Sequence, residues 1–229
     1  MKNLCIIPAR GGSKRIPRKN IKPFMGKPIM AYSIEASLQS GIFDEVMVST
    51  DSEEFADVAR QYGAKVPFMR SEKTANDYAI TADVIEEVLA MYHDRGLDFD
   101  VVCCLYSTAP FVTPVRLKEA YSLLNDDVDA SFTVVEYSFP VQRSHRIDKN
   151  GYIKMVHPEH YSTRSQDLEK TYHDAGQFYF VKTTTFKSER ILWCKRTKPL
   201  VLSELEVQDL DTETDWKLAE LKYELLKRK

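Results

Sequence analysis

A short apolar run followed directly by a glycine-rich, basic loop constrains this chain more than any other feature. Residues 4–7 (Leu-Cys-Ile-Ile) have the length and composition of a buried strand. The adjacent Gly11 and Gly12 allow a sharp turn and let backbone N–H groups approach a ligand closely. The same loop is crowded with positive charge, and no acid precedes Glu35: its cations are Arg10, Lys14, Arg15, Arg18, Lys19 and Lys22. A strand that ends in such a turn is where an α/β protein holds a polyphosphate.

The spacing of this loop excludes two common phosphate motifs. The Walker A pattern GxxxxGK[ST] is absent, and so is the GxGxxG of dinucleotide-binding proteins, which disfavours a P-loop kinase and an NAD enzyme. A basic run is most often a solvated surface loop. Here the position directly after a predicted strand favours the phosphate site.

Composition places the basic feature in a local site. The chain has 229 residues, with 43% hydrophobic and 29% charged, which suits one α/β domain over residues 1–229. The formal net charge is −2, although the first 34 residues hold only positive charge, so the remainder is acidic on balance. We therefore expect no nucleic-acid partner, because such proteins are usually basic overall.

The cysteines and the apolar runs indicate the compartment. Cys5, Cys103, Cys104 and Cys194 show neither CxxC spacing nor a disulfide-framework pattern, so buried thiols are expected. No run approaches membrane-spanning length, and the N-terminal apolar stretch is too short for a signal peptide. These observations predict a cytoplasmic location and no membrane partner.

Strands and helices are predicted to alternate along the chain. Strands are expected at residues 4–7, 46–50, 65–69, 101–105 and 177–181, and helices at about 28–40, 53–62, 79–93 and 212–226. Alternation of this kind implies βαβ units, hence a three-layer, Rossmann-like, mainly parallel sheet with ligands beyond the carboxyl ends of the strands.

Residues 139–172 break this rhythm, because they are polar, rich in His, Arg and Tyr, and have no long periodic run. A segment of this length without regular structure is usually functional, an interface or disordered. We interpret it as an insertion.

A pair of aspartates near the C-terminus is a candidate metal site. Alternate residues of an extended segment point the same way, so Asp209 and Asp211 could present two carboxylates to one Mg²⁺. The simpler alternative is an acidic N-cap region that complements the dipole of the last helix. The predicted polyphosphate loop favours Mg²⁺, since this ion is usually held by one or two carboxylates and phosphate oxygens. Asp51, at a predicted strand end, is a further candidate.

The loop of residues 9–20 closely resembles the ARGGSKxxPxKN motif of the CMP-sialic acid synthetase family of cytidylyltransferases, and the resemblance extends over nearly the whole chain. It implies a nucleotide-diphospho-sugar transferase fold, CTP and a nine-carbon 2-keto sugar acid as substrates, Mg²⁺ as cofactor, and a homodimer. It also implies that the insertion, residues 139–172, closes over substrate and takes part in dimer contacts. In this family two aspartates in the DxD arrangement of Asp209 and Asp211 hold the metal.

The resemblance also implies a set of nucleotide-binding residues. Residue 70 lies in a segment similar to the family's RPxxLAxD, with Ser71 in place of the usual Pro, and Thr81 falls where the family has a small hydroxyl residue. The implied nucleotide-binding residues are Pro8, Ala9, Arg10, Gly11, Gly12, Ser13, Lys14, Lys19, Asn20, Arg70 and Thr81. Those implied to act in catalysis are Arg10, Lys19 and Asp211.

The sugar site departs from the commonest family pattern. Tyr106 stands where LLQPTSPLR has the Gln that touches the sugar, and Val112 replaces its Arg. Residues 172–179 replace the usual NGAIY. These features resemble the branch that activates pseudaminic acid, a relative of sialic acid. The implied sugar-binding residues are Tyr106, Gln142, Arg143, Arg164, Asp174 and Gln177.

Two alternatives stay open. The same reaction could act on N-acetylneuraminate or legionaminate, or the chain could be a non-catalytic nucleotide-binding protein on this fold.

Overall fold

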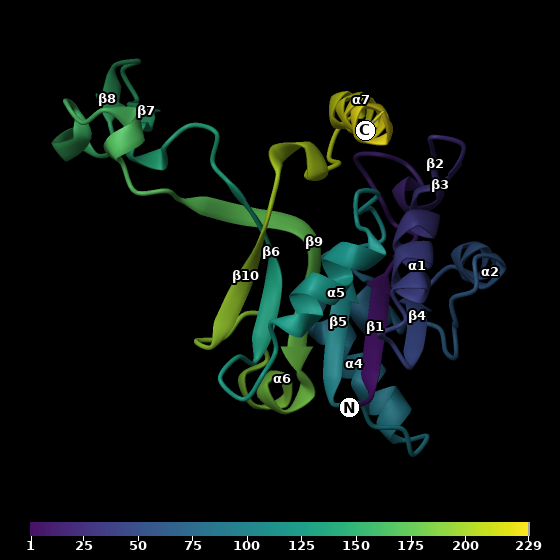
Figure 1. The fold of residues 1–229 in the computed structure, drawn as a ribbon. Coiled ribbons are helices and arrows are strands. Elements are labelled where there is room, and N and C mark those ends of the chain that lie inside the picture. The colour runs from purple at the N-terminus through teal and green to yellow at the C-terminus, as the bar shows by residue number, and fades with distance from the viewer. Residues whose placement is uncertain (229) are drawn as a thin grey trace.

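A six-stranded sheet with helices on both faces forms the body of the molecule (Figure 1). The structure is a computed structural model, and it describes residues 1–228. The strands of the main sheet lie in the order β10-β6-β9-β5-β1-β4. Their bounds are β1 Asn3–Pro8, β4 Glu45–Ser49, β5 Val101–Leu105, β6 Ala130–Glu136, β9 Tyr172–Lys182 and β10 Thr197–Leu202.

The sheet is parallel except for one strand. Strands β4, β1 and β5 run parallel to one another, and β10 runs parallel to β6, whereas β9 is antiparallel to both of its neighbours. The carboxyl ends of β1 and β5 therefore meet at one edge, as the alternation of strands and helices predicted. The predicted three-layer, mainly parallel architecture is confirmed.

Helices bury both faces of the sheet. Helices α1 (Ile29–Ser40), α2 (Glu53–Gln61) and α5 (Pro114–Ser122) pack on one face, with Met30, Phe55 and Leu117 in the core. Helices α4 (Thr81–His93) and α6 (Thr183–Glu189) cover the other. Since β1 and β5 are covered on both sides, they read as continuous apolar runs, and Cys5, Cys103 and Cys104 lie fully buried there.

The last helix, α7 (Glu213–Lys227), closes a separate aromatic cluster over the segment that follows the basic loop. Trp216 packs edge-to-face on Phe24, which also meets Tyr32 edge-to-face. Phe24 belongs to the short hairpin of β2 (Pro23–Phe24) and β3 (Lys27–Pro28). The cluster joins residues near the two ends of the chain, so it fixes where α7 begins relative to the basic loop.

We expect Trp216→Ala to lower the free energy of unfolding by about 3–5 kcal/mol, the usual cost of removing a buried aromatic side chain. Trp216 is only 3% exposed. Leu218→Ala on the same helix is the matched control, since Leu218 is 43% exposed and its loss should change stability by no more than about 0.5 kcal/mol. Urea denaturation measures both, and equal values for the two variants would contradict this packing.

Two parts of the sequence-based prediction differ from the structure. The strand expected at residues 65–69 is reduced to a single bridge between Lys65 and Met47, and Pro67, which cannot donate to a ladder, lies in this stretch. The inner strand β6 and the edge strand β10 were not predicted. Both contain polar residues, such as Ser131 in β6 and Lys198 in β10, so they lack the continuous apolar run of β5.

The predicted insertion appears as an excursion, residues 137–171, between β6 and β9. It contains the hairpin of β7 (His145–Ile147) and β8 (Ile153–Met155) together with short 3-10 turns. Figure 1 shows it projecting away from the helices that flank the sheet. Across residues 1–228, no helix is long and apolar enough to cross a membrane.

Candidate functional site

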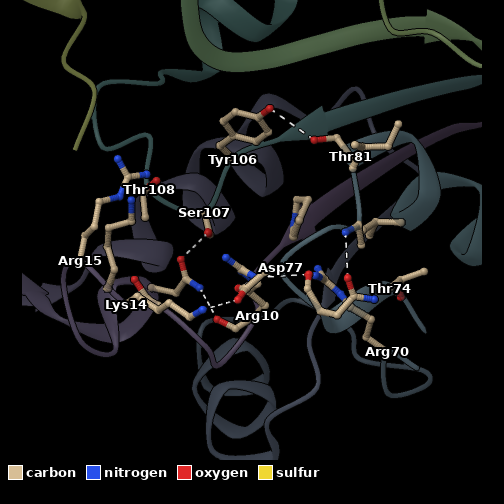
Figure 2. A pocket seen from close by; sticks show the side chains of 18 residues that line it. Arg10, Lys14, Arg15, Arg70, Thr74, Asp77, Thr81, Tyr106, Ser107 and Thr108 are labelled. Atoms are coloured by element: carbon tan, nitrogen blue, oxygen red, sulfur yellow. Dashed lines mark hydrogen bonds and ion pairs between the residues drawn. The ribbon is translucent and has the colours of Figure 1, made fainter. Parts of the chain in front are cut away.

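A cavity of about 510 Å³ opens at the carboxyl ends of β1 and β5 (Figure 2). Three segments build it: the basic loop after β1, the residues after β5, and residues 70–84, which include the short helix α3 (Glu72–Ala75) and the start of α4. The predicted residues that line it are Pro8, Arg10, Ser13, Lys14, Lys19, Asn20, Arg70, Thr81 and Tyr106. A parallel sheet places ligands at this edge.

Two acidic side chains, Asp51 and Asp77, hold the basic loop in place. The Gly11 N–H donates to Asp51 Oδ1 at 2.8 Å, and a Cβ on Gly11 would lie 3.5 Å from Ser52. Asp77 accepts from Arg10 Nη1 at 2.7 Å and from Lys14, so one carboxylate bridges two cations of the loop. These bonds, from Lys14 foremost, lower the pKa of Asp77. Gly11 and Gly12 do not line this cavity but a second hollow that they share with Asp51, and Ala9 is buried.

Asn20 ties the loop to the end of β5. Its Nδ2 donates to the carbonyl of Arg10 at 2.8 Å, and its Oδ1 accepts from Ser107 Oγ at 2.9 Å (Figure 2). The side chain is buried, with both of its polar groups engaged in the protein. Asn20 thus fixes the path of the loop in this structure.

Lys19 meets the C-terminal aspartates. Its Nζ donates to the Leu210 carbonyl at 2.7 Å and lies 3.9 Å from Asp211 Oδ1. Asp211 also pairs with Arg15. Burial lowers the pKa of Lys19, while the charges of Asp211 and then Asp209 act in the opposite direction. Lys19 and Asp211, predicted as a phosphate-binding cation and a metal ligand, therefore lie close together although about 190 residues separate them in the chain.

The aspartate pair fits Mg²⁺ as a minimal ligand set. Among residues 1–228, no three His, Cys, Asp or Glu side chains gather as a metal cluster. Mg²⁺ is commonly held by one or two carboxylates, with waters and substrate phosphates completing its shell. Asp209 is exposed and Asp211 is half-buried beside the cationic loop, so both carboxylates are open to solvent, although neither lines the cavity itself.

Arg70 lies almost wholly buried at the opposite end of the cavity. Its Nε donates to Ser49 Oγ at 3.0 Å, and Nη2 donates to the Ser49 carbonyl at 2.6 Å. Burial lowers the pKa of this guanidinium, while Asp51 and Glu87 oppose the shift. An arginine fixed in this way presents its remaining N–H groups in a preset direction.

The predicted sugar-binding residues fall into two groups. Tyr106 lines the cavity, Asp174 accepts from Tyr179 at 2.7 Å on β9, and the buried Gln177 donates to the Glu206 carbonyl. In contrast, three lie in the excursion, where they make local contacts: Gln142 with Glu169, Arg143 with Thr163, and Arg164 with Asp167. Of the six predicted sugar-binding residues, all within the described chain, only Tyr106 lines the cavity.

Sequence reasoning gave no role to several residues of the site. Asp77, Ser107 and Thr108 line the cavity, and Tyr179 packs against Tyr106. A local signal existed only for Asp77, an acid shortly before a predicted helix. The contacts of Ser107 and Tyr179 depend on the pairing of strands distant in sequence.

Comparison with solved structures gives the class of fold. A CMP:2-keto-3-deoxy-manno-octonic acid synthetase complexed with CTP matches over the full length of both chains, with a TM-score of 0.71 and 18% identity. A 4-diphosphocytidyl-2C-methyl-D-erythritol synthase from Anaerococcus prevotii matches 97% of this chain and 98% of that one, with a TM-score of 0.63 and 13% identity. The chain thus has the α/β fold of nucleotidyltransferases.

Sequence comparison then gives the family. The model described as "Cytidylyltransferase" matches residues 4–222, so the chain belongs to the cytidylyltransferase family. The pseudaminic acid cytidylyltransferase of Campylobacter jejuni is 44% identical over 226 residues, which are 98% of this chain and 97% of that protein. The CMP-N,N'-diacetyllegionaminic acid synthase of Legionella pneumophila is 36% identical, over 98% of this chain and 97% of that protein.

Proposed function

We propose that this chain transfers the cytidylyl group of CTP to a nine-carbon 2-keto sugar acid of the pseudaminic type and releases pyrophosphate. The observation that carries the proposal is a single cavity that joins the cations of the loop to the buried Arg70 and to Thr81. One end can hold phosphates and the other a base. The 44% identity to the Campylobacter protein favours the pseudaminic branch.

Positioning and charge neutralisation carry such a transfer, because phosphoryl chemistry needs little covalent help from the protein. Arg10, Ser13 and Lys14, which line the cavity, hold the phosphates, whereas the Gly11 N–H is engaged by Asp51. The C2 hydroxyl of the sugar attacks the α-phosphorus, a new P–O bond forms there, and the bond to pyrophosphate breaks. Lys19 offsets the charge that develops around the α-phosphate, and Asn20 fixes the loop beside the ribose.

Asp209 and Asp211 are the residues that would hold Mg²⁺. The ion, when bound, neutralises phosphate charge and lowers the pKa of an attacking hydroxyl. The protein's own part is to bring these two carboxylates against Lys19 through the Leu210 carbonyl contact and the packing of Leu210 in the α7 cluster.

We further propose a cytoplasmic homodimer in which the excursion of each chain reaches the partner's cavity. Apolar side chains are exposed there to an unusual degree, at 84% for Phe139, 73% for Ile147 and 68% for Ile153. Surfaces of this kind mark interaction sites. Arg164 on the same excursion can pair bidentately with a sugar carboxylate. A second copy of this chain would bury the apolar residues. The sugar bound by that copy would provide the carboxylate with which Arg164 pairs.

We expect light scattering to give twice the mass of one chain, and Ile153→Asp with Phe139→Asp to give a single-chain mass. The reason is that two buried charges oppose association. Because CTP is held by the body of each chain, CTP binding should persist in this variant while turnover of the sugar is lost. A wild-type protein that is monomeric at assay concentrations and fully active would contradict the dimer.

Pyrophosphate release in the presence of CTP and Mg²⁺ tests the function directly. The panel contains pseudaminate, N-acetylneuraminate, legionaminate and 3-deoxy-manno-octulosonate. Release with pseudaminate alone is the expected result. Release with legionaminate or N-acetylneuraminate instead would support the cytidylyl transfer but contradict the assignment to the pseudaminic branch. Folded protein that binds CTP but releases pyrophosphate with none of the four would favour a nucleotide-binding protein.

A further inference from the structure

One segment carries the chain across the carboxyl ends of the strands to the aspartate pair. Residues 203–212, which we call the strap, join the end of β10 at one edge of the sheet to α7, which packs beside the basic loop (Figure 1). A single 3-10 turn, Glu204–Glu206, is the regular structure within it. Asp209 and Asp211 lie in its second half, so the contacts that fix the strap also fix where these two carboxylates lie.

Two neighbouring elements anchor the first half of the strap at Glu206. Arg116 of α5 donates to the Glu206 carboxylate from Nε at 2.8 Å and from Nη2 at 3.1 Å, which is a bidentate pair. Gln177 of β9, only 4% exposed, donates from Nε2 to the Glu206 carbonyl. The amide that the sequence predicted as a sugar ligand is therefore bound to the backbone of the strap.

Two lysines hold backbone carbonyls on either side of Asp209. Lys222 of α7 donates from Nζ to the Val207 carbonyl at 2.8 Å and to a second carbonyl of the strap at 3.0 Å. Lys19 donates to the Leu210 carbonyl at 2.7 Å. Both hydrogen bonds of the Lys222 side chain thus go to the backbone of the strap.

Apolar contacts fix the strap at the same two points. Val207 is buried in the small cluster at the end of β10, and Leu210 is buried beside Trp216 in the α7 cluster. Asp209, between them, is exposed, and its Oδ1 accepts from the Leu210 N–H at 2.8 Å. The backbone is therefore held before and after an exposed carboxylate.

We propose that Gln177 and Lys222 are positioning residues, which act through the backbone of the strap to preset Asp209 and Asp211 for a divalent cation. The inference rests on the proposed function, which supplies the metal. Two carboxylates on a free segment would have to lose backbone freedom when the ion binds, and that loss would weaken binding. A strap that is already held has lost this freedom on folding.

Calorimetry of CTP binding, without any sugar, tests the proposal when it is carried out once in EDTA and once in saturating Mg²⁺. Lys222→Met removes both hydrogen bonds to the strap. We expect it to raise the dissociation constant of CTP at least about tenfold in Mg²⁺, as for other groups that support metal ligands, and by no more than about twofold in EDTA. Thermal unfolding shows whether each variant is folded.

The loss of charge alone predicts the opposite pattern. It would weaken binding of the anionic CTP in EDTA, and it would favour the bound cation in Mg²⁺. Lys217→Met is the matched control, because Lys217 is exposed on the same helix, and both dissociation constants should stay within about twofold of wild type. Lys222→Arg keeps donors for the carbonyls and should restore the value in Mg²⁺ to within about threefold.

Gln177→Met is the second variant, and it removes the donor to the Glu206 carbonyl at similar side-chain size. We expect the same difference between Mg²⁺ and EDTA. A role of Gln177 in sugar binding would instead raise KM for the sugar and leave both CTP dissociation constants unchanged. Combined with Asp211→Asn, neither variant should raise the constant in Mg²⁺ further, because the pair that the strap presents is already broken.

Folded Lys222→Met and Gln177→Met proteins that keep the wild-type dissociation constants would overturn the inference. Equal losses in Mg²⁺ and in EDTA would also overturn it, since the strap would then act on the nucleotide and not on the metal. Failure of the proposed function is a separate result. If wild type bound CTP more tightly in Mg²⁺ but released no pyrophosphate with any sugar, that function would fall, and the two variants would still decide the role of the strap.

Discussion

Asp211→Asn should lower the rate of pyrophosphate release by about 100–1,000-fold while the protein stays folded. One electrostatic contact in a preorganised site contributes up to about that factor, and an amide is a poor substitute for a carboxylate toward Mg²⁺. Stability should change little, because the ion pair of Asp211 with Arg15 is partly solvated, and such pairs contribute about 0–1 kcal/mol. Steady-state assays across a Mg²⁺ titration, with thermal unfolding in parallel, measure both effects.

Glu213→Gln is the matched control for Asp211→Asn. Glu213 lies two residues further along, and its carboxylate accepts from Lys22 at 2.6 Å, away from Lys19. Its loss removes the same charge from the same segment, yet it should leave the rate within about threefold of wild type, as expected of a surface charge outside the site. A folded Asp211→Asn enzyme with a near-normal rate would remove Asp211 from the proposed metal site.

Lys19→Ala should lower kcat by about 100–1,000-fold, with a smaller effect on the apparent affinity for CTP. The cation is held by the Leu210 carbonyl at 2.7 Å and faces Asp211, so it stands where the phosphates, the aspartates and the loop converge. A charge that offsets what develops during the reaction contributes mainly to kcat. Single-turnover kinetics with saturating CTP separate this effect from weaker binding.

Lys22→Ala is the control that separates a general loss of positive charge from the loss at Lys19. Lys22 belongs to the same basic segment but lies over the Trp216 ring at 4.6 Å and pairs with Glu213. Its removal should cost about 1 kcal/mol of stability at most and little activity. Equal losses of kcat in the two variants would mean that the loop acts only through its summed charge.

Much of the fold could be predicted from local pattern. The continuous apolar run of β5 is typical of a strand covered on both faces, and Gly41 ends α1 at φ +64° as a glycine after a helix does. Local sequence patterns did not predict the strands that are defined mainly by their partners in the sheet. β6 and β10 are recognisable as strands only beside β9 and each other, and the single bridge at Lys65 is less than residues 65–69 suggested.

The candidate site divides in the same way. The basic loop and the aspartate pair could be predicted from the sequence, because each is a short continuous segment with closely spaced cations or carboxylates. The contact of Asp174 with Tyr179 could not be predicted, because it depends on an irregular stretch of β9 that turns the carboxylate toward Tyr179. The same holds for Asp77, whose two cationic partners lie more than 60 residues earlier.

The sequence by itself determined the alternation of elements, the phosphate-type loop after the first strand and the family resemblance, because these follow from neighbours along the chain. Only the tertiary structure decided that Lys19 meets Asp211, that Asn20 is bound to Ser107, and that Arg164 stands apart from the cavity of its own chain. The physical reason is that strand order and helix packing set contacts between distant residues, and those depend on burying the whole core at once rather than on any local preference.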